Sequence, residues 1–144
     1  MNIAFYVNEI STDEQGKEIF SFLNKAVKSE SISDASLFFN NPGPSPEQSH
    51  FGLFNSTELW TYTGLLINTN LQSAIYSLGV VNKFKPVYLF RKRERDIPTF
   101  IFLSNKMPII VTNKEDEQEA FRVTGKRPKL VDLTVESLQE FYNE

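Results

Sequence analysis

Three short polar segments each follow an apolar run and precede a helical pattern. They are Ser11 with Thr12, the run Asn68, Thr69 and Asn70, and Thr112 with Asn113. Free backbone amides at a helix N-terminus attract phosphate, so each segment is a candidate anion site. The alternative is that these side chains only cap their own helices. Each segment contains the spacing of a capping box, in the pairs Ser11 with Glu14, Thr69 with Gln72, and Thr112 with Glu115.

The densest group of cations follows the apolar run 86–90 and consists of Arg91, Lys92, Arg93 and Arg95. If residues 86–90 form a strand parallel to the others, these cations lie at the edge of the sheet where such folds bind ligands. Guanidinium groups there would bind a diphosphate or an acidic partner. The alternative is a solvated, charged loop.

Other familiar chemistry is missing from the sequence. The glycine-rich dinucleotide fingerprint and the phosphate-binding P-loop pattern are absent, which argues against a tightly held dinucleotide or ATP. The chain has no cysteine, which excludes disulfides, thiolate metal sites and cysteine nucleophiles. His50 is the only histidine and has no evident partner. We therefore assign no catalytic residue, and we expect no metal and no cofactor.

The elements that must position these residues alternate between strands and helices. Apolar runs predict strands over residues 2–7, 35–40, 51–54, 65–67, 86–90, 108–111 and 129–132, and helical spacing predicts helices over 12–29, 71–78 and 113–123, with a closing helix after Thr134 or Asp132. Alternation of this kind favours a parallel sheet. We expect residues 1–144 to form one α/β, Rossmann-like domain, with a mostly parallel sheet of five to six strands and helices on both faces.

Two segments leave alternatives open. The apolar residues 98–103 are compatible with either a strand or a buried turn. The proline-rich residues 41–50 cannot form a helix or an interior strand, and they would serve as a flexible lid or as a simple surface connection.

Composition and charge narrow the class of protein. The net charge is −3, whereas a nucleic-acid-binding domain usually carries a basic surface. No run approaches the ~18 apolar residues that a membrane-spanning helix needs. Residues 1–7 lack the basic leader of a signal peptide. We expect a cytoplasmic protein that does not bind a membrane or nucleic acid.

Residues 2–11, residues 64–71 leading to 86–90, and residues 108–115 together carry a resemblance of element order and hydrophobic pattern. The chain resembles small phage-type glycosyltransferase-like proteins, which are similar to a single Rossmann-like half of the two-domain GT-B glycosyltransferases. In this chain Arg91, Lys92 and Arg93 replace an acidic, tryptophan-bearing segment of that family, and its paired glutamates are missing. The resemblance implies a protein of the host cytoplasm that keeps the scaffold without the reaction.

The function that we expect is binding of a sugar nucleotide or another phosphorylated small molecule at the carboxyl ends of the strands. Asn68, Thr69 and Asn70 would supply hydrogen bonds, and Arg91 and Arg93 would supply charge. The protein would be non-catalytic or dependent on a partner; if it is an enzyme, it would be a glycosyltransferase-like transferase. The alternative is a protein–protein interaction module, such as a homodimer, with no small-molecule ligand and with an aromatic surface around Phe51, Phe54 and Trp60.

Overall fold

Seven parallel strands form one sheet in the computed structural model, which describes residues 1–80 and 83–144. The strands are β1 (Asn2–Glu9), β2 (Asp34–Asn41), β3 (Gly52–Asn55), β4 (Thr63–Asn68), β5 (Lys83–Leu89), β6 (Ile109–Val111) and β7 (Lys129–Leu130). Their spatial order is β3-β2-β1-β4-β5-β6-β7. The predicted parallel, Rossmann-like α/β architecture is therefore confirmed. The strand count is higher than five to six because the short edge strands β3 and β7 both join the sheet.

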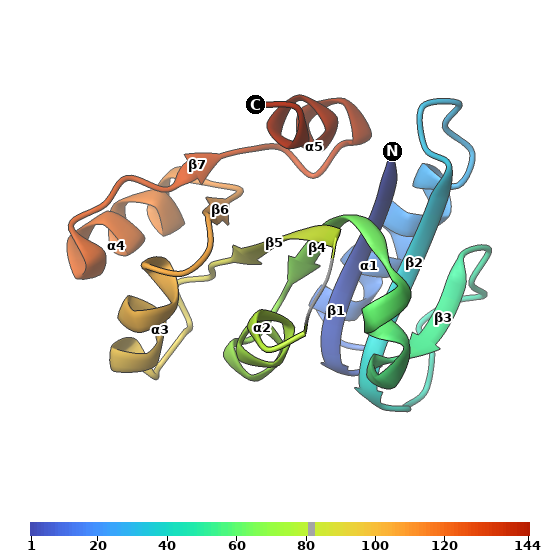
Figure 1. The fold of residues 1–144 in the computed structure, drawn as a ribbon, viewed down its shortest axis with the longest axis horizontal. Helices are drawn as coiled ribbons and strands as arrows, with labels where there is room; N and C mark the ends of the chain where they lie inside the picture. The colour runs from blue at the N-terminus through green and yellow to red at the C-terminus, as the bar shows by residue number, and fades with distance from the viewer. Residues whose placement is uncertain (81–82) are drawn as a thin grey trace.

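The order of the strands reverses at the centre of the sheet. β1 pairs with β2 on one side and with β4 on the other, so the chain builds outward in both directions from β1. In open sheets of this kind, ligands bind outside the carboxyl ends of the strands at such a reversal. Figure 1 shows the arrowheads of β1 and β2, which mark the carboxyl ends of these strands, on one side of the molecule, with the N-terminus and α5 on the opposite side. We call the row of carboxyl ends the carboxyl edge of the sheet. The fold thus places its expected site between the ends of β1 and β4.

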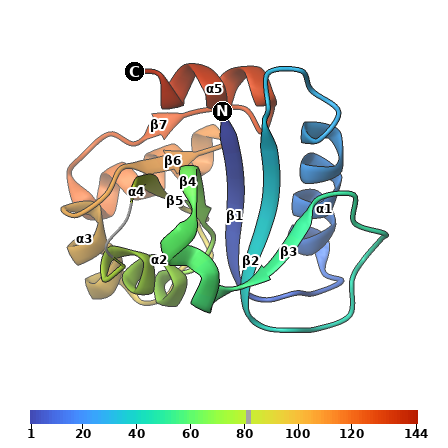
Figure 2. The same cartoon turned by 45° about the vertical axis from the view of Figure 1, so that its right-hand side comes forward.

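Helices cover both faces of the sheet, as predicted. They are α1 (Glu14–Ala26), the 3-10 helix η1 (Ser56–Thr61), α2 (Leu71–Leu78), α3 (Ile97–Ser104), α4 (Lys114–Thr124) and α5 (Val135–Tyr142). α1 and α2 lie on opposite sides of the strands (Figure 2). Within the described part of the chain, no helix is both long enough and apolar enough to cross a bilayer.

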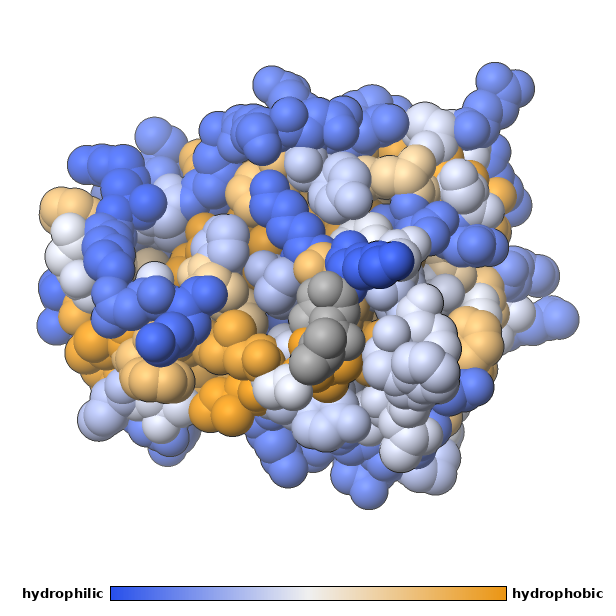
Figure 3. All heavy atoms as spheres, in the orientation of Figure 1, coloured by the Kyte–Doolittle hydropathy of each residue, from blue (hydrophilic) through white to orange (hydrophobic). Residues whose placement is uncertain are grey.

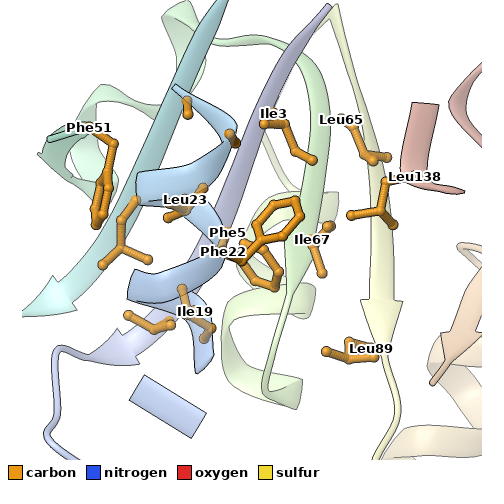
Figure 4. Packing of buried hydrophobic residues seen from close by; sticks show 14 of the residues in the cluster. Ile3, Phe5, Ile19, Phe22, Leu23, Phe51, Leu65, Ile67, Leu89 and Leu138 are labelled. Carbon is orange, nitrogen blue, oxygen red and sulfur yellow. The ribbon is translucent and has the colours of Figure 1, made fainter. Parts of the chain in front are cut away.

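The largest part of the core lies between the sheet and the two helices α1 and α5. Alternate strand residues such as Phe5 and Leu65 face these helices, and the rings of Phe5 and Phe22 pack edge to face with centroids 5.7 Å apart. Leu138 of α5 lies beside Leu65 in the same cluster (Figure 4). The intervening strand residues are buried against η1 and helices α2 to α4. Central strands buried on both faces explain the continuous apolar runs of the sequence.

Residues 98–103 are neither a strand nor an isolated turn, because they lie within helix α3. Asp96 accepts a hydrogen bond from the backbone N–H of Thr99 and so caps the helix, and Pro98 stands in its first turn, where proline is tolerated. The helix is short and mostly apolar, so the 3.6-residue period of a helix cannot be recognised in its sequence. Phe100 and Leu103 are fully buried, whereas Phe102 is half exposed.

The proline-rich segment 41–50 connects β2 to β3 without a helix. Asn24 of α1 holds its far end by donating hydrogen bonds to Glu47 Oε1 at 2.8 Å and to the carbonyl of Gln48 at 2.9 Å. The Asn24 side-chain oxygen also accepts from the backbone N–H of His50 at 2.7 Å. These contacts tie the segment to α1, which supports the surface connection over the lid.

Candidate functional site

A hollow of about 270 Å³ lies at the reversal of strand order, and we call it the switch-point pocket. Its lining comes from the end of β1, the first turns of α1, and the residues that follow β4: Val7, Asn8, Glu9, Ile10, Ser11, Asp13, Gln15, Gly16, Ile19, Phe20, Leu37, Thr69 and Asn70. Two of the residues predicted to bind a ligand, Thr69 and Asn70, therefore line the hollow expected from the topology.

Asn68 lies deeper than its neighbours and does not line this pocket. Its side chain is completely buried, and its Nδ2 donates to the carbonyl of Val87 on β5 at 3.1 Å. Thr69 joins β4 to β1 instead, because its hydroxyl and its backbone N–H both donate to the carbonyl of Tyr6, at 3.1 and 3.2 Å. Asn68 and Thr69 thus fix the end of β4 relative to its two neighbouring strands.

The predicted capping boxes are wrong in detail, because a nearby Asn or Asp caps each helix. Asn70 caps α2 by accepting from the N–H of Ser73 at 2.8 Å, and Asn113 caps α4 by accepting from the N–H of Asp116 at 2.8 Å. Asp13 caps α1. A short Asx side chain reaches the amide three residues ahead directly. The hydroxyls of the predicted capping residues Ser11, Thr69 and Thr112 are therefore available for other hydrogen bonds, such as the bond from Thr69 to Tyr6.

The cap of α1 also determines the charge of the switch-point pocket. The Asp13 carboxylate accepts from the N–H of Gly16 at 2.7 Å and from the hydroxyl of Ser11 at 2.8 Å. These two hydrogen bonds hold the pKa of Asp13 below its ordinary value, and the charge of Arg93 adds to the effect. The carboxylate takes the place that a phosphate would occupy at this helix N-terminus. With Glu9 also in the lining, this pocket is suited to hydroxyl and amide groups of a ligand rather than to phosphate.

A second hollow of about 380 Å³ adjoins the first, and we call it the loop pocket. It is lined by Glu14, Gln15, Glu18, Arg91, Lys92, Arg93, Asn113 and Asp116. Gln15 lines both hollows, and its Nε2 is buried without a hydrogen-bond partner in the described part of the chain. No sequence pattern indicates this residue, since a glutamine in the first turn of an amphipathic helix is usually a solvated side chain.

Arg91 is bound within the protein at the border of the loop pocket. One guanidinium nitrogen donates to Glu18 at 2.7 Å and another donates to the hydroxyl of Thr112 at 2.7 Å, while Asp116 lies 4.0 Å away. Asp116 is itself nearly buried and accepts from the backbone N–H of Lys92 at 2.9 Å. The charge of Arg91 is therefore largely compensated, and its first role is to hold three elements together.

Arg93 has the opposite character. Its side chain is exposed, and no hydrogen bond or ion pair joins it to any residue in the two described ranges, 1–80 and 83–144. Arg93 lines the loop pocket, and its charge contributes to lowering the pKa of Asp13 in the adjoining switch-point pocket. Of the two arginines predicted to bind a ligand, Arg91 and Arg93, it is therefore Arg93 that remains available to an external anion.

Other candidate residues lie outside both pockets. His50 is exposed on the segment that Asn24 holds against α1. Trp60 is 69% exposed on η1, and Phe51 is buried against Phe20, so these two aromatics do not form one surface. No group of three or more His, Asp or Glu side chains within the described residues is arranged to hold a metal ion.

Comparison with known proteins identifies no relative of this chain. No family model, no curated protein and no solved structure matches it. The geometry of the site is therefore the basis on which a function can be proposed.

Proposed function

We propose that this protein binds a phosphorylated small molecule, with a sugar nucleotide as the best-fitting class, along the carboxyl edge of the sheet. One observation supports the proposal above all. The switch-point pocket and the loop pocket adjoin at Gln15, and Arg93, a cation without an ion pair among the described residues, lines the loop pocket. The reversal of strand order at β1 and β4 is where folds of this topology bind ligands.

The two pockets differ in charge in a way that matches the two ends of such a ligand. The switch-point pocket contains the carboxylates of Glu9 and Asp13 and no cation, so it would accept hydrogen bonds from sugar hydroxyls. The loop pocket is lined by three cations and three carboxylates. Because Glu18 and Asp116 lie next to Arg91, the other two cations, Lys92 and Arg93, are left to bind phosphate oxygens. The unpartnered Nε2 of Gln15 would donate a hydrogen bond where the two ends of the ligand meet.

The proposal concerns binding and assigns no reaction. A parallel sheet is compatible with the resemblance to a single Rossmann-like half of the GT-B glycosyltransferases, but many unrelated proteins share such a sheet, and fold alone does not imply an activity. A partner that supplied a second domain would complete an enzyme of that type. The carboxyl edge described above is the surface that such a partner would have to face.

Thermal unfolding with and without millimolar UDP, UDP-glucose, GDP and ATP tests the proposal. A specific ligand at a hundredfold its dissociation constant stabilises the folded state by ~2.7 kcal/mol. We expect Arg93→Ala to reduce that stabilisation and Arg95→Ala to leave it intact, because Arg95 is exposed on the same loop but lines neither pocket. If none of the four compounds raises the unfolding temperature, the proposal is wrong.

The alternative, an interaction module that pairs with a second copy of the chain, is favoured by a different observation. Ile101 and Phe102 of α3 are 38% and 52% exposed, and hydrophobic residues gather over this helix (Figure 3). Contiguous exposed apolar surface of this kind marks interaction sites. Sedimentation velocity of the protein and of Phe102→Glu distinguishes the two functions: a dimer that the substitution dissociates supports the interaction module.

A further inference from the structure

A third hollow, of about 310 Å³, opens at the amino ends of the strands, far from the carboxyl edge. It lies where the starts of β1, β2 and β4 meet β3 and η1, and we call it the amino-end pocket. Its lining includes Asp34, Ser36, Phe38, Phe54, Glu58 and Tyr62. None of them belongs to either pocket of the proposed function.

Ser36 is a buried polar residue in the lining of this pocket. Only 7% of the residue is exposed, and no side-chain hydrogen bond joins it to another described residue; its hydroxyl is still open to the pocket. Asp34, Ser36 and Phe38 alternate along β2 and all line the pocket, as expected for side chains on one face of a strand. A hydroxyl that faces the pocket without a protein partner can accept a hydrogen bond from a ligand there.

Aromatic rings form a wall of the pocket. The ring of Phe38 lies 5.7 Å from that of Phe54 and 5.4 Å from that of Tyr62, measured between centroids. The Phe54 ring folds back over Gly52, where an added Cβ would stand 2.5 Å from a ring carbon. The Tyr62 hydroxyl is already engaged, since it donates to the carbonyl of Leu65 at 2.7 Å. These residues therefore offer ring faces and edges rather than polar groups.

The rim of the pocket is acidic. Asp34 and Glu58 are exposed there, and neither forms an ion pair with any residue that the structure describes. No lysine or arginine from the described ranges lines the pocket. Lys83 pairs in register with Thr63 on the neighbouring strand, but it is not among the lining residues. The charge of the two carboxylates is thus left for a cation from outside.

We propose that the amino-end pocket binds the ammonium group of a small alkylamine. Such a group is attracted by the aromatic faces, bonds to carboxylates, and donates a hydrogen bond to a hydroxyl oxygen. Its alkyl chain packs against the rings. A phosphorylated ligand would be repelled by the rim, so this site and the carboxyl edge select opposite charges.

Calorimetric titration of the whole protein with 1,4-diaminobutane, at constant ionic strength, tests the proposal. We expect saturable binding of one amine per chain, and no binding of 1,4-butanediol, which has the same length but no charge. Ser36→Ala should weaken binding by about tenfold or more, because it removes a hydrogen bond from a charged group. Glu58→Gln, which keeps an acceptor and removes the charge of an exposed side chain, should weaken binding by about two- to fivefold. Glu30→Gln, which neutralises an exposed carboxylate outside the pocket lining, should leave the affinity unchanged.

Three outcomes would overturn the proposal. The first is a titration with 1,4-diaminobutane that shows no saturable binding, and the second is binding of 1,4-butanediol with the same affinity. The third is an equal loss of affinity in Glu30→Gln and Glu58→Gln, which would indicate that the amine is attracted by net charge alone. Ser36→Ala is not expected to lower the unfolding temperature, because its hydroxyl has no partner to lose. Glu58 is exposed, so Glu58→Gln tests the proposal even if Ser36→Ala fails to fold.

Discussion

Arg91 and Glu18 form an ion pair of 2.7 Å between residues that are 73 positions apart in the sequence. The pair joins a residue that follows β5 to the second turn of α1, across the end of the intervening strands. Because Arg91 also bonds to Thr112 after β6, one side chain connects three elements along the carboxyl edge. A planar guanidinium group can make both bonds at once, whereas an ammonium group is a single point charge.

We expect Arg91→Ala to lower the free energy of unfolding by about 1–3 kcal/mol, because it removes hydrogen bonds between charged or polar groups and leaves Asp116 without its nearby cation. Arg91→Lys should recover only part of the loss. Urea unfolding of both variants measures the effect.

A double-mutant cycle of Arg91→Ala with Glu18→Gln separates the parts of this network. Glu18 is 46% exposed, so we expect a coupling of only about 0.2–1 kcal/mol with Arg91. The rest of the Arg91 effect then comes from Thr112 and Asp116. A coupling as large as the whole effect of Arg91→Ala would contradict this assignment.

The cap of α2 gives a second prediction. Asn70 accepts the N–H of Ser73, so Asn70→Ala should lower the free energy of unfolding by about 1 kcal/mol. Gln72→Ala is the matched control, because a capping box would need Gln72, whereas the observed cap does not use it. If Gln72→Ala costs as much as Asn70→Ala, Asn70 is not the residue that caps this helix.

How far the sequence predicts this fold can be seen from particular elements. The apolar runs around Leu65 and Ile109 identify central, parallel strands, because burial on both faces leaves little alternation. The sequence does not predict helix α3, because IPTFIFLS is apolar apart from Thr99 and Ser104, so neither a period of two nor one of 3.6 stands out. The edge strand β7 has only two residues, and it lies within the range 129–132 where the sequence predicts a strand.

The candidate site was predictable in place but not in detail. The polar residues after β4 mark the carboxyl ends of the strands, and Thr69 and Asn70 do line a pocket there. The burial of Asn68 and the pairing of Arg91 with Glu18 depend on contacts between elements distant in the sequence, which a local pattern does not contain. Gln15 becomes notable only because the packing of α1 places it between two pockets.

Two glycines with positive φ give a third prediction, with each serving as the reference for the other. Gly64 in β4 has φ +123°, and an added Cβ would stand 2.4 Å from the carbonyl oxygen of Asn2. Gly125 after α4 has φ +72°, with no atom within 4 Å of an added Cβ. Gly125→Ala should cost about 1 kcal/mol from backbone strain alone.

Gly64→Ala should cost several times more, since strain is joined by a clash with backbone that cannot move without displacing β1. Chemical unfolding of the two variants measures the difference. Equal costs would mean that β1 and β4 separate freely at this point, which their pairing at Ile3 and Leu65 argues against.

Asp13 gives a prediction about pH. Its pKa is lowered in the folded protein by the N–H of Gly16 first and by the Ser11 hydroxyl second. The unfolded chain therefore binds the proton more readily, so this carboxylate stabilises the folded state above its ordinary pKa of 3.8. That stabilisation is lost as the pH falls below 3.8 and through the lowered value.

Asp13→Asn isolates this effect, because asparagine keeps an acceptor for the helix amide but does not titrate. We expect the parent protein to be more stable than Asp13→Asn by about 0.3–1 kcal/mol near neutral pH, from the favourable position of a negative charge at the start of α1. The difference should shrink as the pH falls below 3.8, because the other carboxylates titrate in both proteins and cancel. A difference that stays constant with pH would show that Asp13 acts only as a neutral acceptor and that its charge does not contribute to the cap.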